Sequence, residues 1–295
     1  MKVFFWNIGS TLTERKLDLI KEAIEGEMPD IFCIAEGSHS IIDCEKLNLC
    51  FEEKKYFCYY SPLFSKKEEL LLGYDYNRNG LKIFCRDERQ LQSQFQFSLQ
   101  RHEGRIVVLH AYVNFKITTF IFLHNKSKGG SNAVDLAQMP FILTLREMID
   151  YGKITSVAQK LDIMKNTERV IIIGDFNLEP WDEVLKHKDF LSTSFFRNHN
   201  GMKQRNNSIN HYFNPVVELL TKSDFQNLGG TYYSDSVGWA LFDYVLYNTS
   251  DCDISYEIVV GFKGGSKLLE DDVSIKKSFL RDGLDHLPIS TTITD

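Results

Sequence analysis

Apolar runs separated by polar segments recur along the whole chain, and several have the composition of buried strands. Residues 1–7, MKVFFWN, are rich in aromatic and β-branched side chains, and residues 30–36, DIFCIAE, are mostly apolar between their terminal acids. Residues 169–175, RVIIIGD, have the same character. Continuous apolar runs of this length are typical of strands that are covered on both faces. The pattern therefore predicts sheets that lie between other layers of structure.

Residues 11–30 follow a helical period instead. Apolar residues spaced three and four positions apart share one face of the predicted helix, and these residues are Leu17, Ile20 and Ile24. We expect Thr11 and Glu14 to form a capping box at the start of this helix. Glycine is the residue type that most often ends a helix, so we expect the C-cap at Gly26.

The rest of the chain predicts more strands than helices. Residues 90–100 place apolar side chains on alternate positions, which indicates a half-buried strand, residues 134–165 predict helix, and the polar residues 198–210 predict a loop. Further strands are expected at 81–86, in a hairpin of 105–113 with 116–124, and at 230–234, 240–248, 254–262 and 287–293. Without an internal repeat or a linker-like stretch, this mixture favours one α/β domain with layered sheets over residues 1–295.

Composition and charge narrow the classes of function. The net charge is −6, which argues against a general electrostatic coat protein for nucleic acid, although a cleft that binds divalent cations still attracts phosphates. Six cysteines without a CxxC pair favour a reduced, cytoplasmic protein with no disulfide or zinc framework. The apolar start is too short for a secretory leader, and no window approaches the length of a membrane span. We therefore expect no membrane partner.

Side chains with catalytic or metal-binding potential stand at or near the ends of six predicted strands. They are Asn7, Glu36, His124, Asp175 with Asn177, Asp243, and Asp285 with His286. Taken singly, each has a structural explanation, because Asp and Asn at a strand end usually form turns or cap helices. Taken together they indicate a site, because strand ends of one polarity collect at one rim of a sheet, where ligands bind.

Short motifs surround these residues. They are WN (6–7), AE (35–36), LHNKS (123–127), GDFN (174–177), FDYVL (242–246) and DH.P (285–288). In this order the set resembles the endonuclease/exonuclease/phosphatase superfamily. The resemblance implies an α/β fold of two face-to-face packed mixed β-sheets flanked by helices, a four-layer sandwich. The chain departs from the usual pattern at Ala35, Asn125 and Leu284, positions that do not carry out the chemistry in that superfamily.

The resemblance also implies a divalent metal, Mg²⁺ or Mn²⁺, and assigns it ligands. Glu36 is the best candidate, Asp285 is a second, and Asn7 completes or orients the site. These residue types suit the chemistry, since Mg²⁺ takes oxygen ligands and usually only one or two carboxylates from the protein.

The remaining motif residues match the superfamily's catalytic positions. Asp175 is implied to orient or deprotonate water beside the attacked phosphorus, and Asn177 to donate to a phosphate oxygen or to that water. His286 would stabilise charge or transfer a proton, with Asp243 fixing its tautomer. His124 matches a position that contacts the phosphate or protonates the leaving group. Two lysines that follow it are expected to contact flanking phosphates: Lys126 and Lys128.

Three functions are consistent with this site. The first is a metal-dependent nuclease that hydrolyses phosphodiester bonds of DNA or RNA. The second is a phosphatase or phosphodiesterase for a small molecule or a lipid head group. The third is a catalytically inactive binding module, which the complete set of motif residues argues against. A serine hydrolase is disfavoured because the chain has no GxSxG motif.

Overall fold

The computed structural model describes most of the chain, and the structural statements below concern these residues only. They are residues 1–37, 40–60, 80–86, 105–113, 116–125, 127, 142, 143, 145, 169–187, 191–195, 212–221, 229–236, 238–248, 252–270 and 274–294. The predicted strand at 90–100, the predicted loop at 198–210 and nearly all of the predicted helix at 134–165 lie outside them.

Two six-stranded sheets form the centre of the molecule. The first has the order β13 (Asp253–Ile258), β16 (Ile289–Thr294), β1 (Lys2–Asn7), β2 (Ile31–Ala35), β4 (Leu81–Cys85), β3 (Phe57–Tyr60). The second has the order β5 (Ile106–Val113), β6 (Lys116–His124), β7 (Arg169–Asp175), β12 (Asp243–Tyr247), β9 (Tyr212–Phe213), β8 (Thr193–Ser194). Both sheets are mixed: β1 pairs with β2, and β6 with β7, in parallel, whereas β1 with β16 and β7 with β12 are antiparallel.

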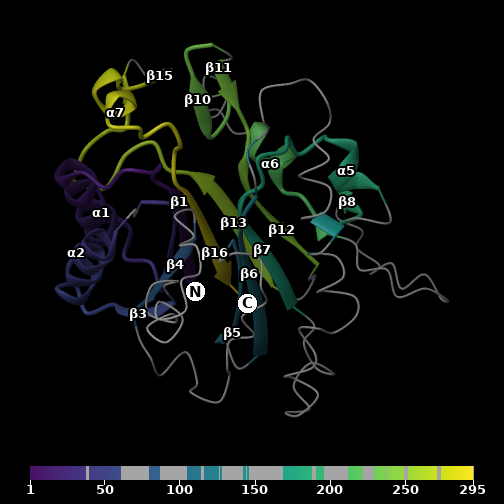
Figure 1. Ribbon diagram of the computed structural model, residues 1–295. Coiled ribbons are helices and arrows are strands. Elements are labelled where there is room, and N and C mark those ends of the chain that lie inside the picture. The colour runs from purple at the N-terminus through teal and green to yellow at the C-terminus, as the bar shows by residue number, and fades with distance from the viewer. Residues whose placement is uncertain are drawn as a thin grey trace, which may run out of the picture.

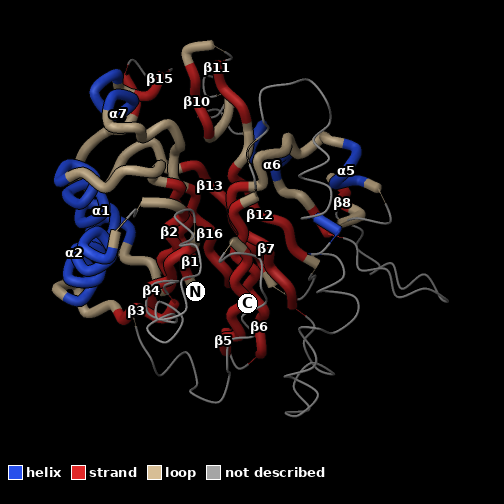
Figure 2. Tube along the Cα trace, in the orientation of Figure 1, coloured by secondary structure: helices blue, strands red, loops and turns tan. Residues whose placement is uncertain are grey.

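The sheets pack face to face between helices. β1 contacts β7, β4 contacts β6 and β12 contacts β16 across the space between the sheets. Helices α1 (Glu14–Glu27) and α2 (Ile41–Glu52) lie beside the first sheet (Figure 1). On the far side of the second sheet lie the short helices α5 (Glu183–Lys186) and α6 (Val216–Leu220), so that the strands occupy the middle of the molecule (Figure 2). The expected α/β fold of two packed mixed sheets flanked by helices is confirmed.

Smaller elements lie at one end of the sheets (Figure 1). They are the hairpin of β10 (Tyr232–Ser234) and β11 (Gly238–Ala240), the pair β14 (Leu269–Glu270) and β15 (Ser274–Ile275), and helix α7 (Lys277–Arg281). An isolated bridge joins Tyr232 to His286, so the β10–β11 hairpin begins directly beside the loop that leads into β16.

The apolar strands are buried on both faces, as their sequences predict. Phe4, Phe5 and Trp6 on β1 have no exposed surface, and every residue of β7 is buried. Burying large apolar side chains supplies the main driving force for folding, at roughly 25 cal/mol per Å² of apolar surface removed from water. The central strands therefore form a stiff support for the residues that follow them.

The helix predicted at residues 11–30 is present, but its caps differ from the expectation. The N-cap is Thr13, whose side chain accepts from the backbone N–H of Lys16 at 3.2 Å, and no capping box forms between Thr11 and Glu14. Met28, in the left-handed conformation with φ 43°, is the C-cap. Gly26 lies within the last turn, where a Cβ would stand 2.9 Å from the backbone nitrogen of Lys263. Close packing therefore explains this glycine.

Replacing Gly174 by alanine is expected to destabilise the protein by about 3 kcal/mol, because the neighbouring backbone leaves no room for a side chain. Gly174 lies opposite Leu123 in the parallel pair of β7 with β6, and a Cβ would stand 1.9 Å from the Leu123 carbonyl oxygen. Urea unfolding measures the change. Gly264→Ala is the control, because its added Cβ meets nothing within 4 Å and only its positive φ is unfavourable. Equal destabilisation of the two variants would contradict this account.

Two further findings bear on the composition. No helix in the described part of the chain is long and apolar enough to cross a membrane. All six cysteines fall in that part, and no disulfide joins any two of them. Burial raises the pKa of the Cys33 and Cys85 thiols well above the ordinary value, which disfavours the reactive thiolate form.

Candidate active site

The register of the second sheet aligns three of the expected residues in one row. β6 and β7 run parallel and end together, so His124 lies opposite Asp175. β12 runs antiparallel to β7, and its first residue, Asp243, lies opposite Asp175 from the other side. Adjacent strands are about 5 Å apart. The sheet therefore presents His124, Asp175 and Asp243 side by side at one edge.

The first sheet contributes residues from the ends of its own strands. Asn7 is the last residue of β1 and lies opposite Ala35, the last residue of the parallel strand β2, so Glu36 follows directly. β16 runs antiparallel to β1, and the loop that leads into it carries Asp285 and His286. Because β1 and β2 are parallel and β16 is antiparallel to β1, the polar residues of the first sheet lie at the same rim.

Direct contacts join the two rims. The Asn7 Nδ2 donates to Asp175 Oδ2 at 3.0 Å. His124 Nε2 lies 3.3 Å from Glu36 Oε1 and 3.8 Å from Asp175 Oδ2. Asn7, His124 and Asp175 are buried, whereas the Glu36 side chain keeps 20% of its surface exposed. The structure therefore places residues from four strand ends around one point between the sheets.

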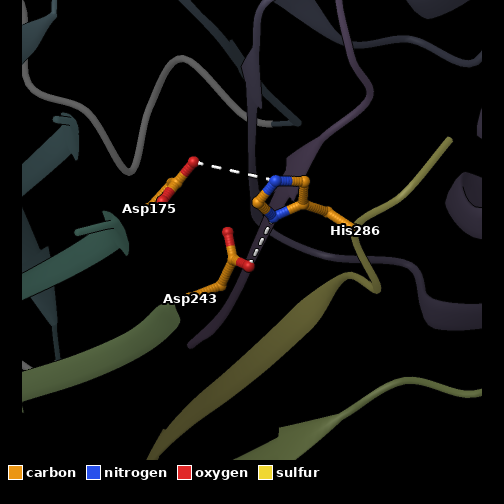
Figure 3. Close-up of side chains that lie close together, drawn as sticks. All are labelled: Asp175, Asp243 and His286. Atoms are coloured by element: carbon orange, nitrogen blue, oxygen red, sulfur yellow. Dashed lines mark hydrogen bonds and ion pairs between the residues drawn. The ribbon is translucent and has the colours of Figure 1, made fainter. Parts of the chain in front are cut away.

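His286 lies between two aspartates (Figure 3). Its Nδ1 is 2.8 Å from Asp243 Oδ2, and its Nε2 faces Asp175 Oδ2 at 4.0 Å. Thr231 Oγ1 accepts the backbone N–H of Asp243 at 2.9 Å, and Trp6 Nε1 donates to the His286 carbonyl oxygen at 3.0 Å. The bond from Trp6 on β1 and the bond to Thr231, just before β10, hold this pair in place, and Asp243 fixes which imidazole nitrogen faces the centre of the site.

Burial and neighbouring charges together shift the pKa values of His286 and Asp175. Burial lowers the pKa of His286, but the charge of Asp243 and its hydrogen bond outweigh that effect and raise the pKa to about 10. Burial raises the pKa of Asp175 to about 7, and the charge of Asp243 adds to that shift. His286 and the hydrogen bond from Asn7 act in the opposite direction. The site therefore holds a proton-bearing imidazole beside a carboxyl group whose pKa is close to neutral pH.

Asp175 is further fixed by the turn that follows β7. Its Oδ1 accepts the backbone N–H of Asn177 at 2.9 Å, and Asn177 itself has φ 49°. The Asn177 side chain donates to the Asn125 carbonyl oxygen at 3.0 Å, and Asn125 donates to the Phe176 carbonyl oxygen at 2.9 Å. The two asparagines thus tie the ends of β6 and β7 together, a supporting role for Asn125 that the sequence did not reveal.

Lys16 ties the loop that follows Asn7 to the loop that carries Asp285 and His286. Its Nζ donates to the carbonyl oxygens of Thr11 at 2.8 Å and Gly283 at 3.3 Å, and also to that of Ile8. The side chain is buried, and burial lowers its pKa to about 8 against the opposing charges of Asp285, Asp282 and Glu36. Lys16 therefore fixes the loop after β1 to the segment just before Asp285 through carbonyl oxygens on both.

The donor atoms of the site suit a hard divalent cation. Glu36, Asp285 and Asn7 offer oxygen atoms, which Mg²⁺ and Mn²⁺ prefer. Close by, Asp175, Asp243 and His286 each have one ligand atom within 4.8 Å of the others. Asp243 Oδ1 is buried and, among the described residues, accepts no hydrogen bond. This concentration of carboxylate oxygens fits a cation, which would offset their mutual repulsion.

Two residues expected to contact flanking phosphates lie outside the described part of the chain. Of the expected site residues, Lys126 and Lys128 are the two that lie outside the described residues. Several residues that support the site were not expected from the sequence. Thr231, Asn125 and Lys16 act through backbone atoms of other segments, and no local sequence pattern marks such a role. By contrast, Lys82 is a charged residue inside the apolar run LKIFC, and its unusual position is visible in the sequence.

Comparisons with known proteins agree with this geometry. The model of the endonuclease/exonuclease/phosphatase family matches residues 4–263. No curated protein matches the chain in sequence. Among solved structures, the human Nocturnin catalytic domain with bound sulfate is 19% identical with a TM-score of 0.53, and the alignment covers 100% of this chain and 94% of that one.

Two further structures show how widely the same fold is used. A mannosyl-6-phosphatase from Bacteroides thetaiotaomicron is 13% identical with a TM-score of 0.55, and both chains are covered completely (100%). An AP endonuclease from Archaeoglobus fulgidus is 15% identical with a TM-score of 0.51, with 99% of this chain and 98% of that chain covered. At these identities the likeness shows the fold and not the substrate. Because the family model spans most of the sequence, the chain belongs to the endonuclease/exonuclease/phosphatase family of phosphoesterases.

Proposed function

We propose that this protein is a divalent-metal-dependent phosphoesterase, and specifically a nuclease that hydrolyses phosphodiester bonds of DNA or RNA. The observation that carries the proposal is the buried cluster of Asp175, His286 and Asp243, with Asn7 bonded to Asp175 and Glu36 in contact with the neighbouring His124. Hydrolysis of a phosphodiester requires charge neutralisation on phosphate oxygens, an oriented water and help for the leaving oxygen. The site has a group suited to each requirement.

Glu36, Asp285 and Asn7 would hold Mg²⁺ or Mn²⁺. The bound cation would neutralise charge on the non-bridging phosphate oxygens. Asn7 also donates to Asp175 at 3.0 Å, so the proposed metal ligands and the proposed catalytic carboxylate are mechanically connected.

Asp175 and His286 would act on the water and the phosphate. Asp175, supported by hydrogen bonds from Asn7 and from the Asn177 backbone, would orient the attacking water and accept its proton. His286, its Nδ1 held by Asp243, would direct Nε2 toward the phosphate and stabilise the negative charge that develops there. His124, 3.3 Å from Glu36, would contact the phosphate or the leaving oxygen.

An aromatic ring beside the histidine supports a nucleic acid substrate. The Tyr232 ring lies 4.9 Å from the His286 ring and stacks on Phe242 at 5.3 Å. Tyr232 is only partly buried. A partly exposed aromatic ring next to the phosphate position can stack on a nucleobase, an interaction worth about 1–3 kcal/mol per base. This observation favours a polynucleotide over a compact sugar phosphate.

A substrate panel tests the proposal. With Mg²⁺ and then Mn²⁺, the protein would be assayed on single- and double-stranded DNA, RNA, an abasic-site duplex, bis-p-nitrophenyl phosphate, a sugar phosphate and an inositol phosphate. We expect metal-dependent cleavage of a polynucleotide, and product lengths will show endonucleolytic or exonucleolytic cleavage. Hydrolysis of the small esters alone would replace the nuclease with a phosphatase. No hydrolysis of any substrate would leave only a binding module.

A further inference from the structure

A lysine is buried inside the first sheet, directly behind the loop that carries Glu36. Lys82 is the second residue of β4 and keeps only 3% of its surface exposed. It lies opposite Ile34 on β2, and its neighbour Leu81 lies opposite Ala35. A charged residue is almost never fully buried unless it is paired. The position of Lys82 among apolar strand residues therefore needs a specific explanation.

The partners of Lys82 are two backbone carbonyl groups. Its Nζ donates to the carbonyl oxygen of Glu36 and, at 3.3 Å, to that of Gly80. Among the described residues, no carboxylate pairs with Lys82, so these two carbonyl oxygens are the hydrogen-bond partners of its ammonium group. Because the Glu36 carbonyl belongs to the residue that we propose as the principal metal ligand, Lys82 acts on the backbone of that residue and not on its carboxylate.

The Glu36 backbone has a conformation that requires such support. Its φ is 63°, in the left-handed region, and Gly37 follows with φ 73°. For a residue with a side chain, this conformation is unfavourable and persists only where the surroundings hold it. Gly37 packs so closely on the loop after β1 that an added Cβ would stand 2.3 Å from Ile8 Cδ1. The chain is thus held from two sides at the point where Glu36 leaves β2.

We propose that Lys82 is a positioning residue that holds the Glu36 backbone in its left-handed conformation and so directs the Glu36 carboxylate toward the divalent cation. The proposal rests on the proposed function, which makes Glu36 a metal ligand. Lys82 itself would touch neither metal nor substrate. Residues that orient metal ligands in this way commonly contribute 10–100-fold to metal affinity or activity.

A purely structural role for Lys82 predicts a different result. In that case, removing the amine would change the free energy of unfolding but not the metal affinity. Lys82→Met keeps a side chain of similar length and removes the donor to Glu36. Lys54→Met is the matched control, because Lys54 pairs with Glu25 in a partly exposed ion pair on the helical side of the first sheet.

The deciding experiment is calorimetric titration of Mn²⁺ into the wild type, Lys82→Met and Lys54→Met, with circular dichroism to verify folding. We expect the Kd for Mn²⁺ to rise about tenfold in Lys82→Met and to stay unchanged in Lys54→Met. In hydrolysis assays, excess Mn²⁺ should restore most of the kcat of Lys82→Met, because the catalytic groups on the second sheet are intact.

Each outcome has a defined meaning. A wild-type Kd in folded Lys82→Met would overturn the positioning role and leave the proposed function standing. Failure of the wild type to bind Mn²⁺ would overturn the proposed function, and the positioning role with it. If Lys82→Met does not fold, Lys82→Gln decides the question. Its shorter side chain should weaken Mn²⁺ binding, and unchanged binding would reject the proposal.

Discussion

His286→Ala is expected to lower kcat for phosphodiester hydrolysis by about a thousandfold, which is within the range for loss of a positioned acid–base group. The imidazole is buried, and its Nδ1 lies 2.8 Å from Asp243, so Nε2 is directed at the centre of the site. Alanine removes the only imidazole that Asp243 orients among the described residues. Metal binding should change little, because Glu36 and Asn7 are unaffected.

The measurement is steady-state hydrolysis at saturating Mg²⁺, with thermal unfolding to verify the fold. Asp243→Asn provides a companion variant, since it keeps the shape of the side chain but removes the charge that holds the imidazole. We expect a substantial but smaller loss of kcat from Asp243→Asn. If His286→Ala retained wild-type kcat with a normal melting curve, His286 would have no catalytic role.

Asp175→Asn is expected to lower kcat by a similar factor, about a thousandfold, while the protein still folds. Asparagine preserves the shape of the side chain, but it cannot accept a proton from water. The carboxylate is buried beside Asp243, and burial raises its pKa from 3.8 to about 7. Removing this buried acid removes an unfavourable ionisation, whereas losing one acceptor oxygen leaves one of its two donors, Asn7 Nδ2 or the Asn177 N–H, unmatched.

The pH dependence of stability gives an independent check in the metal-free protein. Between the ordinary pKa of 3.8 and the native value of about 7, the folded protein keeps a proton on Asp175 that the unfolded chain has released. The free energy of unfolding contributed by this group therefore falls as the pH rises through that window. Asp175→Asn should flatten the fall, as measured by urea unfolding from pH 4 to pH 8. Unchanged kcat in Asp175→Asn would contradict its proposed role.

The grouping of these residues at one place could be predicted from the sequence because the relevant information is local. Each expected residue stands at the end of an apolar run, and strand pairing decides which ends meet. Asp175 illustrates this: its strand was visible as RVIIIGD, and parallel pairing with β6 then placed His124 beside it. The strand registers within the two sheets bring these strand ends together at one site.

The supporting residues were not predictable because their partners are distant in the sequence. Thr231 supports Asp243 through a backbone N–H, and Lys16 bonds to Gly283, which is 267 residues away. The helix caps were wrong for a related reason. Gly26 has a residue type common at helix ends, but packing against Lys263 explains it, and Met28 takes the left-handed position. Local propensity cannot register such tertiary contacts.

The most direct test of the central claim is hydrolysis of a labelled oligonucleotide by the protein before metal removal, after treatment with EDTA, and after Mg²⁺ is added back. Wild type and Asp175→Asn would be compared in each state. We expect wild-type cleavage to be lost with EDTA and to recover with Mg²⁺, and we expect Asp175→Asn to stay near background throughout. Cleavage that persists in EDTA, or that survives in Asp175→Asn, would contradict a metal-dependent phosphoesterase site at these strand ends.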